Sequence, residues 1–218
     1  MIIVCGGIKG GGGKTTVATN LAVMRSLAGK DVLLVDADSM DNRNASDFAA
    51  LRKEKLGRSD LTAVQLQGKT LGQEMTRLGE KFDDVIVDVG GQDSINQRSA
   101  LVVADVLLVP VFPSSFDVWT LENVSTLIEQ ARGFNDRLRA FSFLSRADST
   151  GSQNEDASEL IGEYRNLVFL DTPLRNRKAF RVASSQGLGV VELRPKDTKA
   201  ISEMEALYRT VFNIKTIS

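Results

Sequence analysis

Short apolar runs alternate along the chain with segments whose apolar residues recur every three or four positions. The runs are rich in valine, isoleucine and leucine, which is typical of parallel strands buried on both faces. Strands are predicted at Ile2–Cys5, Val32–Asp36, Val85–Asp88, Val106–Val111, Phe141–Leu144 and Leu167–Leu170, with a further short strand at 62–67. Because strand and helix patterns alternate throughout, the sequence predicts a doubly wound α/β fold on a mostly parallel sheet of about seven or eight strands.

The segments between these runs have helical spacing. The apolar positions of the clearest helices are Val17, Leu21, Met24 and Ala28; Val118, Leu121, Val124 and Ile128; and Ile201, Met204, Leu207 and Val211. Glycine commonly ends helices, so Gly29 and Gly133 are the expected stops of the first two. A helix is also expected near 70–79, and residues 146–156 are expected to form a polar loop.

Bulk composition narrows the class of protein. The chain has 218 residues, 42% hydrophobic, with a net charge of −1, which fits one domain over residues 1–218 and confines any binding of nucleic acid or membrane to a local patch. It has no histidine and a single cysteine, Cys5, which excludes a Ser-His triad, His-ligated zinc and a CxxC redox pair. The chain is expected to be cytoplasmic, because no secretory signal is visible and the longest apolar stretch, 101–112, contains Asp105 and is too short for a membrane span.

A glycine-rich loop follows the first predicted strand and opens a predicted helix. Four glycines, a lysine and two threonines stand there in order: Gly10, Gly11, Gly12, Gly13, Lys14, Thr15 and Thr16. Glycines let backbone N–H groups curl around an anion, and the helix adds its positive N-terminal end. Lys14 would reach the terminal phosphates and the Thr15 hydroxyl would complete a Mg²⁺ site, so the sequence predicts a P-loop.

A second lysine distinguishes this loop from the ordinary P-loop pattern. Ile8 stands where the first glycine of G-x-x-x-x-G-K-[ST] is expected, and Lys9 follows it. The resulting K-G-G-x-G-K-T-T resembles the deviant Walker A motif of the ParA/MinD family, which are SIMIBI-like P-loop ATPases. The resemblance implies an ATP-sandwiched dimer in which Lys9 contacts the partner's nucleotide while Lys14 contacts its own. The alternative for Lys9 is an ordinary solvated lysine at the edge of a loop.

Acidic residues end two further predicted strands. Asp36 and Asp38 end one strand and, being two residues apart, point the same way, while Asp88 ends another. Carboxylates beyond strand ends near a phosphate loop suit Mg²⁺ hydration and a positioned water. The family resemblance implies that Asp36 and Asp88, with Thr15, serve the Mg²⁺ and that Asp38 orients or activates the attacking water. A helix N-cap is the alternative for Asp38.

Two loops depart from the family pattern. Ser39 and Met40 replace the usual Pro-Gln after D-x-D, and Gly90 and Gly91 replace the usual Thr-Pro-Pro. We expect the two glycines to let the backbone approach the γ-phosphate.

The segment ADVLLVPVFPSSFDVW resembles the part of ParA ATPases that lies at the dimer interface near the nucleotide. Its prolines would end a strand, and Ser114 or Ser115 would cap the next helix. Asp117 and Trp119 are equally explained as a first-turn acid and a core aromatic.

The carboxyl-terminal part resembles the ParA segment that frames the nucleotide base. Thr172 and Pro173 are therefore expected to border the adenine, and Ser145 and Arg146 to supply a polar contact. The same segment holds a basic cluster: Arg175, Arg177, Lys178 and Arg181. On a helix these would form a positive ridge opposite Phe180 and Ala183, and a solvated helix face is the simplest explanation. Because ParA proteins bind DNA without sequence preference through such residues, the resemblance implies salt-sensitive DNA binding.

The chain begins at its first strand, so an N-terminal helix-turn-helix domain is not expected, and over nearly its full length it resembles the short ParF-like plasmid partition ATPases. The resemblance implies weak, partner-stimulated ATP hydrolysis with Mg²⁺, an ATP-dependent homodimer, binding to nucleoid DNA and a ParB-like centromere-binding partner. One alternative is a MinD-like membrane-associated ATPase, which needs a tail that folds on lipid; the acids in EMEALYRTVFNIKTIS favour a helix packed on its own domain. Another is a metabolic ATP-dependent amidase or synthetase with the same fold.

Overall fold

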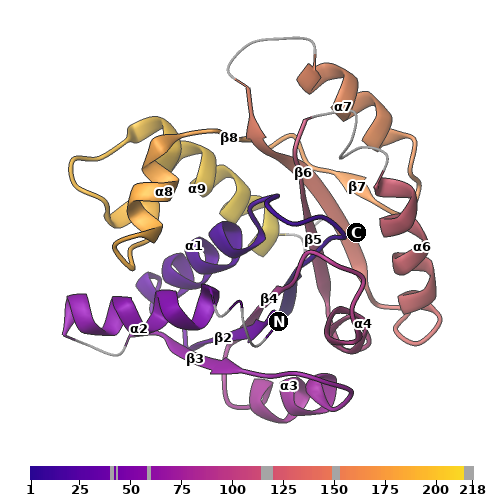
Figure 1. Cartoon of the computed structure of the whole chain (residues 1–218), viewed down its shortest axis with the longest axis horizontal. Coiled ribbons are helices and arrows are strands. Elements are labelled where there is room, and N and C mark those ends of the chain that lie inside the picture. The colour runs from indigo at the N-terminus through magenta and orange to yellow at the C-terminus, as the bar shows by residue number, and fades with distance from the viewer. Residues whose placement is uncertain (40–41, 43, 58–59, 114–119, 149–152, 214–218) are drawn as a thin grey trace.

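The computed structural model describes residues 1–39, 42, 44–57, 60–113, 120–148 and 153–213. Within these residues eight parallel strands form one sheet in the order β3-β2-β4-β1-β5-β6-β7, and β8 pairs with the far end of β6 (Figure 1). The strands are β1 (Ile2–Cys5), β2 (Val32–Ala37), β3 (Thr62–Gln65), β4 (Asp84–Val89), β5 (Val106–Val111), β6 (Arg139–Ala147), β7 (Val168–Phe169) and β8 (Leu174–Arg175). The predicted doubly wound parallel sheet is confirmed.

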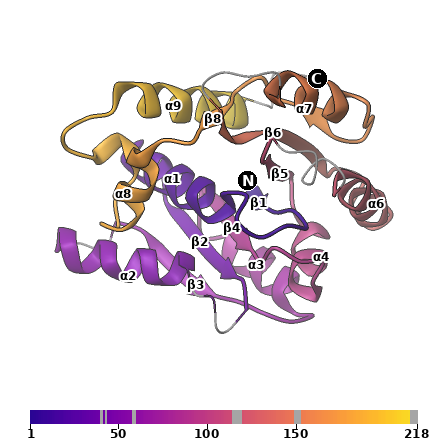
Figure 2. The same cartoon turned by 45° about the horizontal axis from the view of Figure 1, so that its top comes forward.

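Helices cover both faces of this sheet (Figure 2). One face carries α1 (Lys14–Leu27), α2 (Asn44–Leu56), α8 (Lys178–Ser184) and α9 (Thr198–Asn213), with the short 3₁₀ helix η1 (Val190–Glu192) between the last two. The other face carries α3 (Leu71–Gly79), α4 (Ile95–Leu101), α6 (Leu121–Arg132) and α7 (Gln153–Gly162). The sheet therefore separates two apolar cores, which is why its central strands are apolar at nearly every position.

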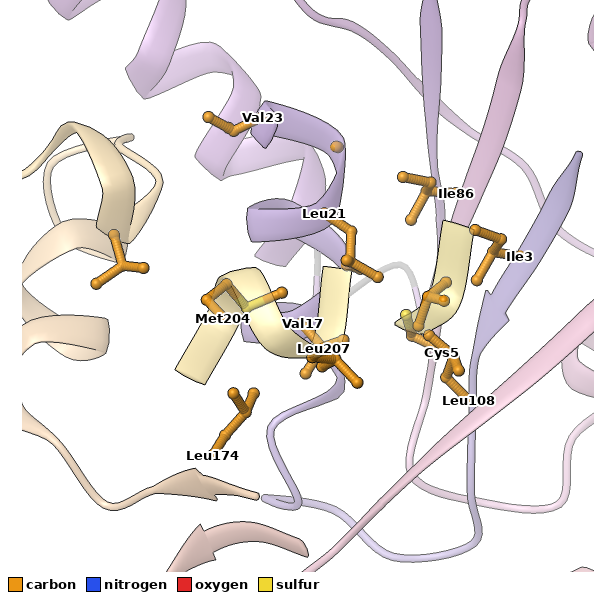
Figure 3. Packing of buried hydrophobic residues seen from close by; sticks show 14 of the residues in the cluster. Ile3, Cys5, Val17, Leu21, Val23, Ile86, Leu108, Leu174, Met204 and Leu207 are labelled. Carbon is orange, nitrogen blue, oxygen red and sulfur yellow. The ribbon is translucent and has the colours of Figure 1, made fainter. Parts of the chain in front are cut away.

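The core on the α1 side shows how the carboxyl-terminal helix is used. Met204 and Leu207 of α9 are fully buried against Val17 and Leu21 of α1, and the Cys5 side chain lies in the same cluster (Figure 3). Cys5 is thus a small core residue, as its place in an apolar strand suggested. The apolar face of α9 is buried inside the fold. In the described part of the chain, no helix has the length and apolar character needed to cross a membrane.

Several element predictions need correction. The polar loop expected at 146–156 is shorter, because β6 continues to Ala147 and α7 begins at Gln153; residues 149–152 lie outside the described part. The helices α2 and α4 were not anticipated, since α2 is mostly polar and α4 is only 7 residues long. The strand expected at Leu167–Leu170 is reduced to Val168–Phe169. Met40, Ser114, Ser115, Asp117, Val118 and Trp119 lie outside the described residues.

The direction of winding reverses at β1. From β1 the chain moves through β2 to β3 on one side, then returns through β4 to β5 on the other. In an open parallel sheet, ligands bind beyond the carboxyl ends of the strands at such a reversal. The loops that follow β1, β2 and β4 meet there.

Candidate functional site

A pocket of about 680 Å³ opens beyond the carboxyl ends of β1, β2 and β4. Its lining comes from the loops after β1, β2 and β4, the first turns of α1, α2 and α4, and one residue each of β6 and α8. The residues are Gly10, Gly11, Gly13, Lys14, Thr15, Thr16, Ala37, Asp38, Ser39, Asn42, Asn44, Val89, Gly90, Gly91, Gln92, Ser94, Asn96, Arg146 and Ser184. The structure thus brings the glycine-rich loop, Asp38 and the two glycines after β4 to one place.

The glycine-rich loop has a conformation that only glycine adopts easily. Gly11 and Gly13 have φ angles of 80° and 94°, in the left-handed region that disfavours side chains. A Cβ on Gly13 would also lie 2.7 Å from the Ser145 hydroxyl. The loop leads directly into α1, whose first residue is Lys14. Backbone N–H groups at the start of a helix form a cradle suited to phosphate.

Lys14 is the central cation of the pocket. Its side chain is only 7% exposed, and its Nζ donates a hydrogen bond to the Lys9 carbonyl at 2.8 Å. Burial lowers the pKa of Lys14, while the negative charges of Asp88 and Asp38 oppose that shift. A buried ammonium that faces two carboxylates stays positioned to meet phosphate charge.

Asp88 is a buried carboxylate at the carboxyl end of β4. Burial raises its pKa to about 7, with a further rise from the charge of Asp36, while the Thr15 hydroxyl and Lys14 lower it. Thr15 lies near enough to influence this pKa, yet neither Asp88 oxygen has a partner with hydrogen-bond geometry within the described residues. A buried carboxylate with both oxygens unpaired is destabilised, and a divalent cation or its bound water would stabilise it.

Asp36 makes a different set of contacts. Its Oδ2 accepts a hydrogen bond of 2.8 Å from the backbone N–H of Ser46, and its Oδ1 accepts one of 3.3 Å from that of Asp38. Ser46 lies in the first turn of α2, so Asp36 fixes the start of that helix to the end of β2. The carboxylate also contributes negative charge beside Asp88.

Asp38 lies at the edge of the pocket against the loop that follows β4. Its Oδ1 accepts a hydrogen bond of 2.7 Å from Ser39 N–H. A Cβ on Gly90 would lie 2.5 Å from the same oxygen, so any larger residue there would require the Asp38 carboxylate to move. A Cβ on Gly91 would lie 2.5 Å from the Gly10 nitrogen, so Gly91 packs on the phosphate loop itself.

These residues fit Mg²⁺ held jointly with a nucleotide. No group of three or more acidic, cysteine or histidine side chains suited to a metal occurs in the described part of the chain. Mg²⁺ keeps several waters and typically takes only one or two carboxylates together with substrate phosphates. The hydroxyl of Thr15 and the unpaired oxygens of Asp88 match that requirement.

A family model agrees with this geometry. The model of the CobQ/CobB/MinD/ParA nucleotide-binding domain matches residues 2–191. The chain belongs to this family.

Individual relatives are similar to most of the chain. The maintenance of carboxysome distribution protein A of Halothiobacillus neapolitanus is 26% identical over 206 residues, covering 94% of this chain and 93% of the relative. The chromosome-partitioning ATPase Soj of Thermus thermophilus is 31% identical over 164 residues, covering 62% of this chain and 65% of Soj. Among solved structures, apo McdA from Cyanothece has a similar fold, with a TM-score of 0.78 at 19% identity over 96% of this chain and 98% of that one.

The residues expected to border the base in this CobQ/CobB/MinD/ParA-type chain fall in two places. Thr172 and Pro173 do not reach the phosphate pocket and line a separate open hollow beside β8 and α9. Ser145 and Arg146 lie at the phosphate loop, and both line a smaller hollow of about 200 Å³ next to Gly13. The structure therefore groups Ser145 and Arg146, but not Thr172 and Pro173, with the candidate nucleotide site.

The expected basic ridge is only partly a helix face. Arg177 precedes α8 in an extended conformation, so Arg177 and Arg181 are not neighbours on one helix. Glu203 of α9 pairs with Arg177 at 2.6 Å and with Arg175 at 3.3 Å, and its charge offsets theirs. Lys178 and Arg181 are exposed. The core-facing positions Phe180 and Ala183 are buried as expected.

Three amide side chains at the site were not anticipated. Gln67 and Asn96 donate hydrogen bonds to the carbonyls of Asp38 and Ala37. Gln97 is fully buried, and its Oε1 accepts a hydrogen bond of 2.9 Å from Gly7 N–H where the chain enters the phosphate loop. Gln97 faces the core from α4, a helix too short to be predicted from its apolar spacing, so the sequence carries no signal for its burial. The sequence offers no signal for Gln67 or Asn96 either.

Proposed function

We propose that this protein is an ATP-dependent partition ATPase. In this proposal it forms an ATP-sandwich dimer, binds DNA without sequence preference, and segregates or positions plasmid DNA with a ParB-like partner. The observation that supports it most directly is that Lys14 and Asp38 line one pocket built around a phosphate loop that also carries Lys9, with Asp88 buried close enough to Lys14 to affect its pKa. Membership of the CobQ/CobB/MinD/ParA family supports the nucleotide chemistry.

Each residue has a distinct role in the proposed hydrolysis. The backbone of Gly10–Gly13 and the side chains of Lys14, Thr15 and Thr16 hold the phosphates. Thr15 and the carboxylate of Asp88, with Asp36 in support, would hold Mg²⁺, which would supply positive charge to neutralise the phosphate oxygens. Asp38 orients the attacking water and accepts its proton.

The proposed role of Lys9 connects nucleotide to dimerisation. Its carbonyl already accepts the hydrogen bond from Lys14, and its side chain is half-buried at the rim of the phosphate loop. A cation from the partner protomer at the terminal phosphates would make pairing depend on the triphosphate. Lys9→Ala should then leave ATP binding by the monomer intact while it prevents the ATP-dependent dimer. Size-exclusion chromatography with light scattering, with ATP and with ADP, measures this.

DNA binding is proposed to use the basic cluster beside α8. Lys178 and Arg181 supply exposed charge, and Arg175 and Arg177 add theirs to the extent that Glu203 leaves it uncompensated. Dimerisation doubles this surface, which raises the avidity for a DNA polyanion. A nucleoid location and a dependence on salt follow from such phosphate contacts.

A second cargo class is suggested by the relative matched over most of both chains. Its name assigns it to carboxysome distribution, so a protein assembly rather than a plasmid is the second candidate cargo. Both cargoes would use the same ATPase cycle on DNA. A plasmid cargo predicts that a centromere-binding protein stimulates ATP hydrolysis, whereas a protein-assembly cargo predicts that a protein bound to that assembly does so.

One experiment tests the core of the proposal against its alternatives. Binding of a random-sequence DNA duplex is measured with ATP, ADP and no nucleotide, at low and at high salt, and vesicles of anionic lipid are tested in parallel. The proposal requires DNA binding that depends on ATP and weakens with salt, without vesicle binding. ATP-dependent vesicle binding would instead support a MinD-like role. Absence of binding to both, with turnover of a carboxylate substrate, would support an amidase or synthetase.

A further inference from the structure

The end of β2, where Asp38 lies, is fixed by two amide side chains from other parts of the chain. The Nδ2 of Asn96, on α4, donates a hydrogen bond of 2.9 Å to the Ala37 carbonyl. The Nε2 of Gln67, which follows β3, donates one of 2.7 Å to the Asp38 carbonyl. The carbonyls of Ala37 and Asp38 are therefore held by two side chains from different parts of the chain.

The two amides are also joined to each other. The Oδ1 of Asn96 accepts a hydrogen bond of 2.8 Å from the N–H of Gly68, the residue after Gln67. Both ends of the Asn96 amide are thus in use, which fixes its orientation. Gln67, Gly68 and Asn96 form a closed frame around the backbone of residues 37 and 38, and we name Gln67 and Asn96 the amide clamp.

Within the part of the chain that the structure describes, the hydrogen bond to the carboxylate of Asp38 comes from the adjacent Ser39 N–H. This donor moves with the same loop. The position of the carboxylate therefore depends on the position of the backbone. Because Asn96 belongs to α4, which follows Gly90 and Gly91, the clamp also fixes Asp38 relative to the loop that packs on the phosphate loop.

We propose that Gln67 and Asn96 are positioning residues for ATP hydrolysis, acting through the backbone to place the Asp38 carboxylate. This inference rests on the proposed role of Asp38. Gln67 is outside the lining of the nucleotide pocket, and Asn96 lines the pocket with both of its amide atoms engaged by Ala37 and Gly68. Loss of the clamp should therefore lower kcat and leave ATP affinity nearly unchanged. Displacement of a catalytic group by about 1 Å can lower a rate by roughly 100-fold, so a decrease in kcat of about 10- to 100-fold is expected.

The test uses two variants and a matched control. Asn96→Ala removes one arm of the clamp, and Gln67→Met removes the other while it keeps the length of the half-buried side chain. Ser99→Ala is the control, because Ser99 also lies on α4, where its hydroxyl accepts a hydrogen bond of 3.0 Å from Gly72 N–H and donates one of 3.1 Å to the Lys69 carbonyl, and neither bond reaches Ala37 or Asp38. For each full-length protein, kcat is measured by phosphate release at saturating Mg·ATP. Affinity is measured by titration with a fluorescent N-methylanthraniloyl ATP.

The expected result is a lower kcat in both clamp variants, ATP affinity within about threefold of the parent, and no change in Ser99→Ala. If Asn96→Ala fails to fold, as judged by its thermal transition, Gln67→Met alone decides the question. The inference is refuted if the folded clamp variants turn over as the parent does, if Ser99→Ala loses as much activity, or if affinity falls as far as kcat.

Asp38→Ala is measured in parallel to separate this inference from the proposed function. Loss of hydrolysis in Asp38→Ala together with parent-like clamp variants overturns only the clamp. Parent-like hydrolysis in Asp38→Ala overturns the role of Asp38 and the clamp with it.

Discussion

Replacing Gly91 with alanine tests whether the loop after β4 and the phosphate loop are packed as one unit. An ideal Cβ at this position would lie 2.5 Å from the Gly10 nitrogen, 2.6 Å from the Gly10 Cα and 2.8 Å from the Lys9 carbonyl carbon. All three atoms belong to the backbone, so no side-chain rotation relieves the overlap. Ordinary contact begins near 3.4 Å, and the two loops must therefore separate by about 0.6 to 0.9 Å.

The separation should affect stability and nucleotide binding together. Overpacking of this kind costs about 1–3 kcal/mol of unfolding free energy, which urea denaturation of the nucleotide-free protein measures. The displaced phosphate loop should bind the fluorescent ATP analogue about 10-fold more weakly, which corresponds to about 1.4 kcal/mol. Phosphate release should fall further, because Asp38 packs on the neighbouring Gly90 and moves with it.

Gly162→Ala is the matched control for this substitution. Gly162 lies in the last turn of α7, and a Cβ there has no atom within 4 Å. Its nucleotide affinity should equal that of the parent, and its stability should be unchanged or slightly higher, because alanine favours helix. The packing argument is refuted if Gly91→Ala also keeps the parent's stability and affinity.

Three further substitutions test two residues of the site and one buried ion-pair cluster outside it. Lys14→Ala should abolish binding of the ATP analogue, because it removes the buried cation of the phosphate loop; measurable affinity within 10-fold of the parent would contradict this role. Asp88, with its pKa raised to about 7 from 3.8, keeps a proton in the folded state that the unfolded chain releases. Its contribution to the free energy of unfolding is therefore complete below about pH 3.8 and is lost as pH rises to about 7, a change on the order of a few kcal/mol. Asp88→Asn should remove this pH dependence, which urea denaturation in the presence of EDTA measures. Arg52 is 1% exposed and pairs with Asp60 and Glu192 at 2.7 Å each. Arg52→Met should lower the free energy of unfolding by about 3 kcal/mol in urea denaturation, because it removes the cation from between two carboxylates. A decrease below about 1 kcal/mol would show that water solvates the two carboxylates when the guanidinium is absent.

Most of the fold follows from local patterns in the sequence. Strands such as Val32–Ala37 and Val106–Val111 are buried at every position, so a continuous apolar run is sufficient to locate them. The helix α9 is predicted from the helical spacing of Ile201, Met204, Leu207 and Val211, of which the last three are buried. By contrast, α4 is too short for a clear period, and β8 has only two residues, whose pairing with β6 depends on tertiary context.

The site divides in the same way between local and non-local features. The phosphate loop and the acids at strand ends are short motifs, so their residues could be named in advance, and the structure brings Lys14, Asp38 and Asp88 together. Glu203 lies 26 residues from Arg177 in the sequence. The spacing of the basic cluster therefore does not predict that Glu203 offsets the charges of Arg175 and Arg177. The amide clamp likewise joins residues 29 and 59 positions from their partners in β2 and its following loop.

The glycines that replace the usual residues after Asp88 show why such contacts matter for mechanism. The sequence led us to expect that Gly90 and Gly91 admit the γ-phosphate, whereas in the structure their most evident effect is to let three loops touch. Gly90 packs on Asp38 and Gly91 on Gly10, while Asn96 holds Ala37 from the helix that follows. The Gly91 backbone leaves no room for a shift of Gly10 toward it, and close-packed neighbours transmit such a shift. We therefore expect movement of the phosphate loop to displace the loop after β4 and, through Gly90, the Asp38 segment.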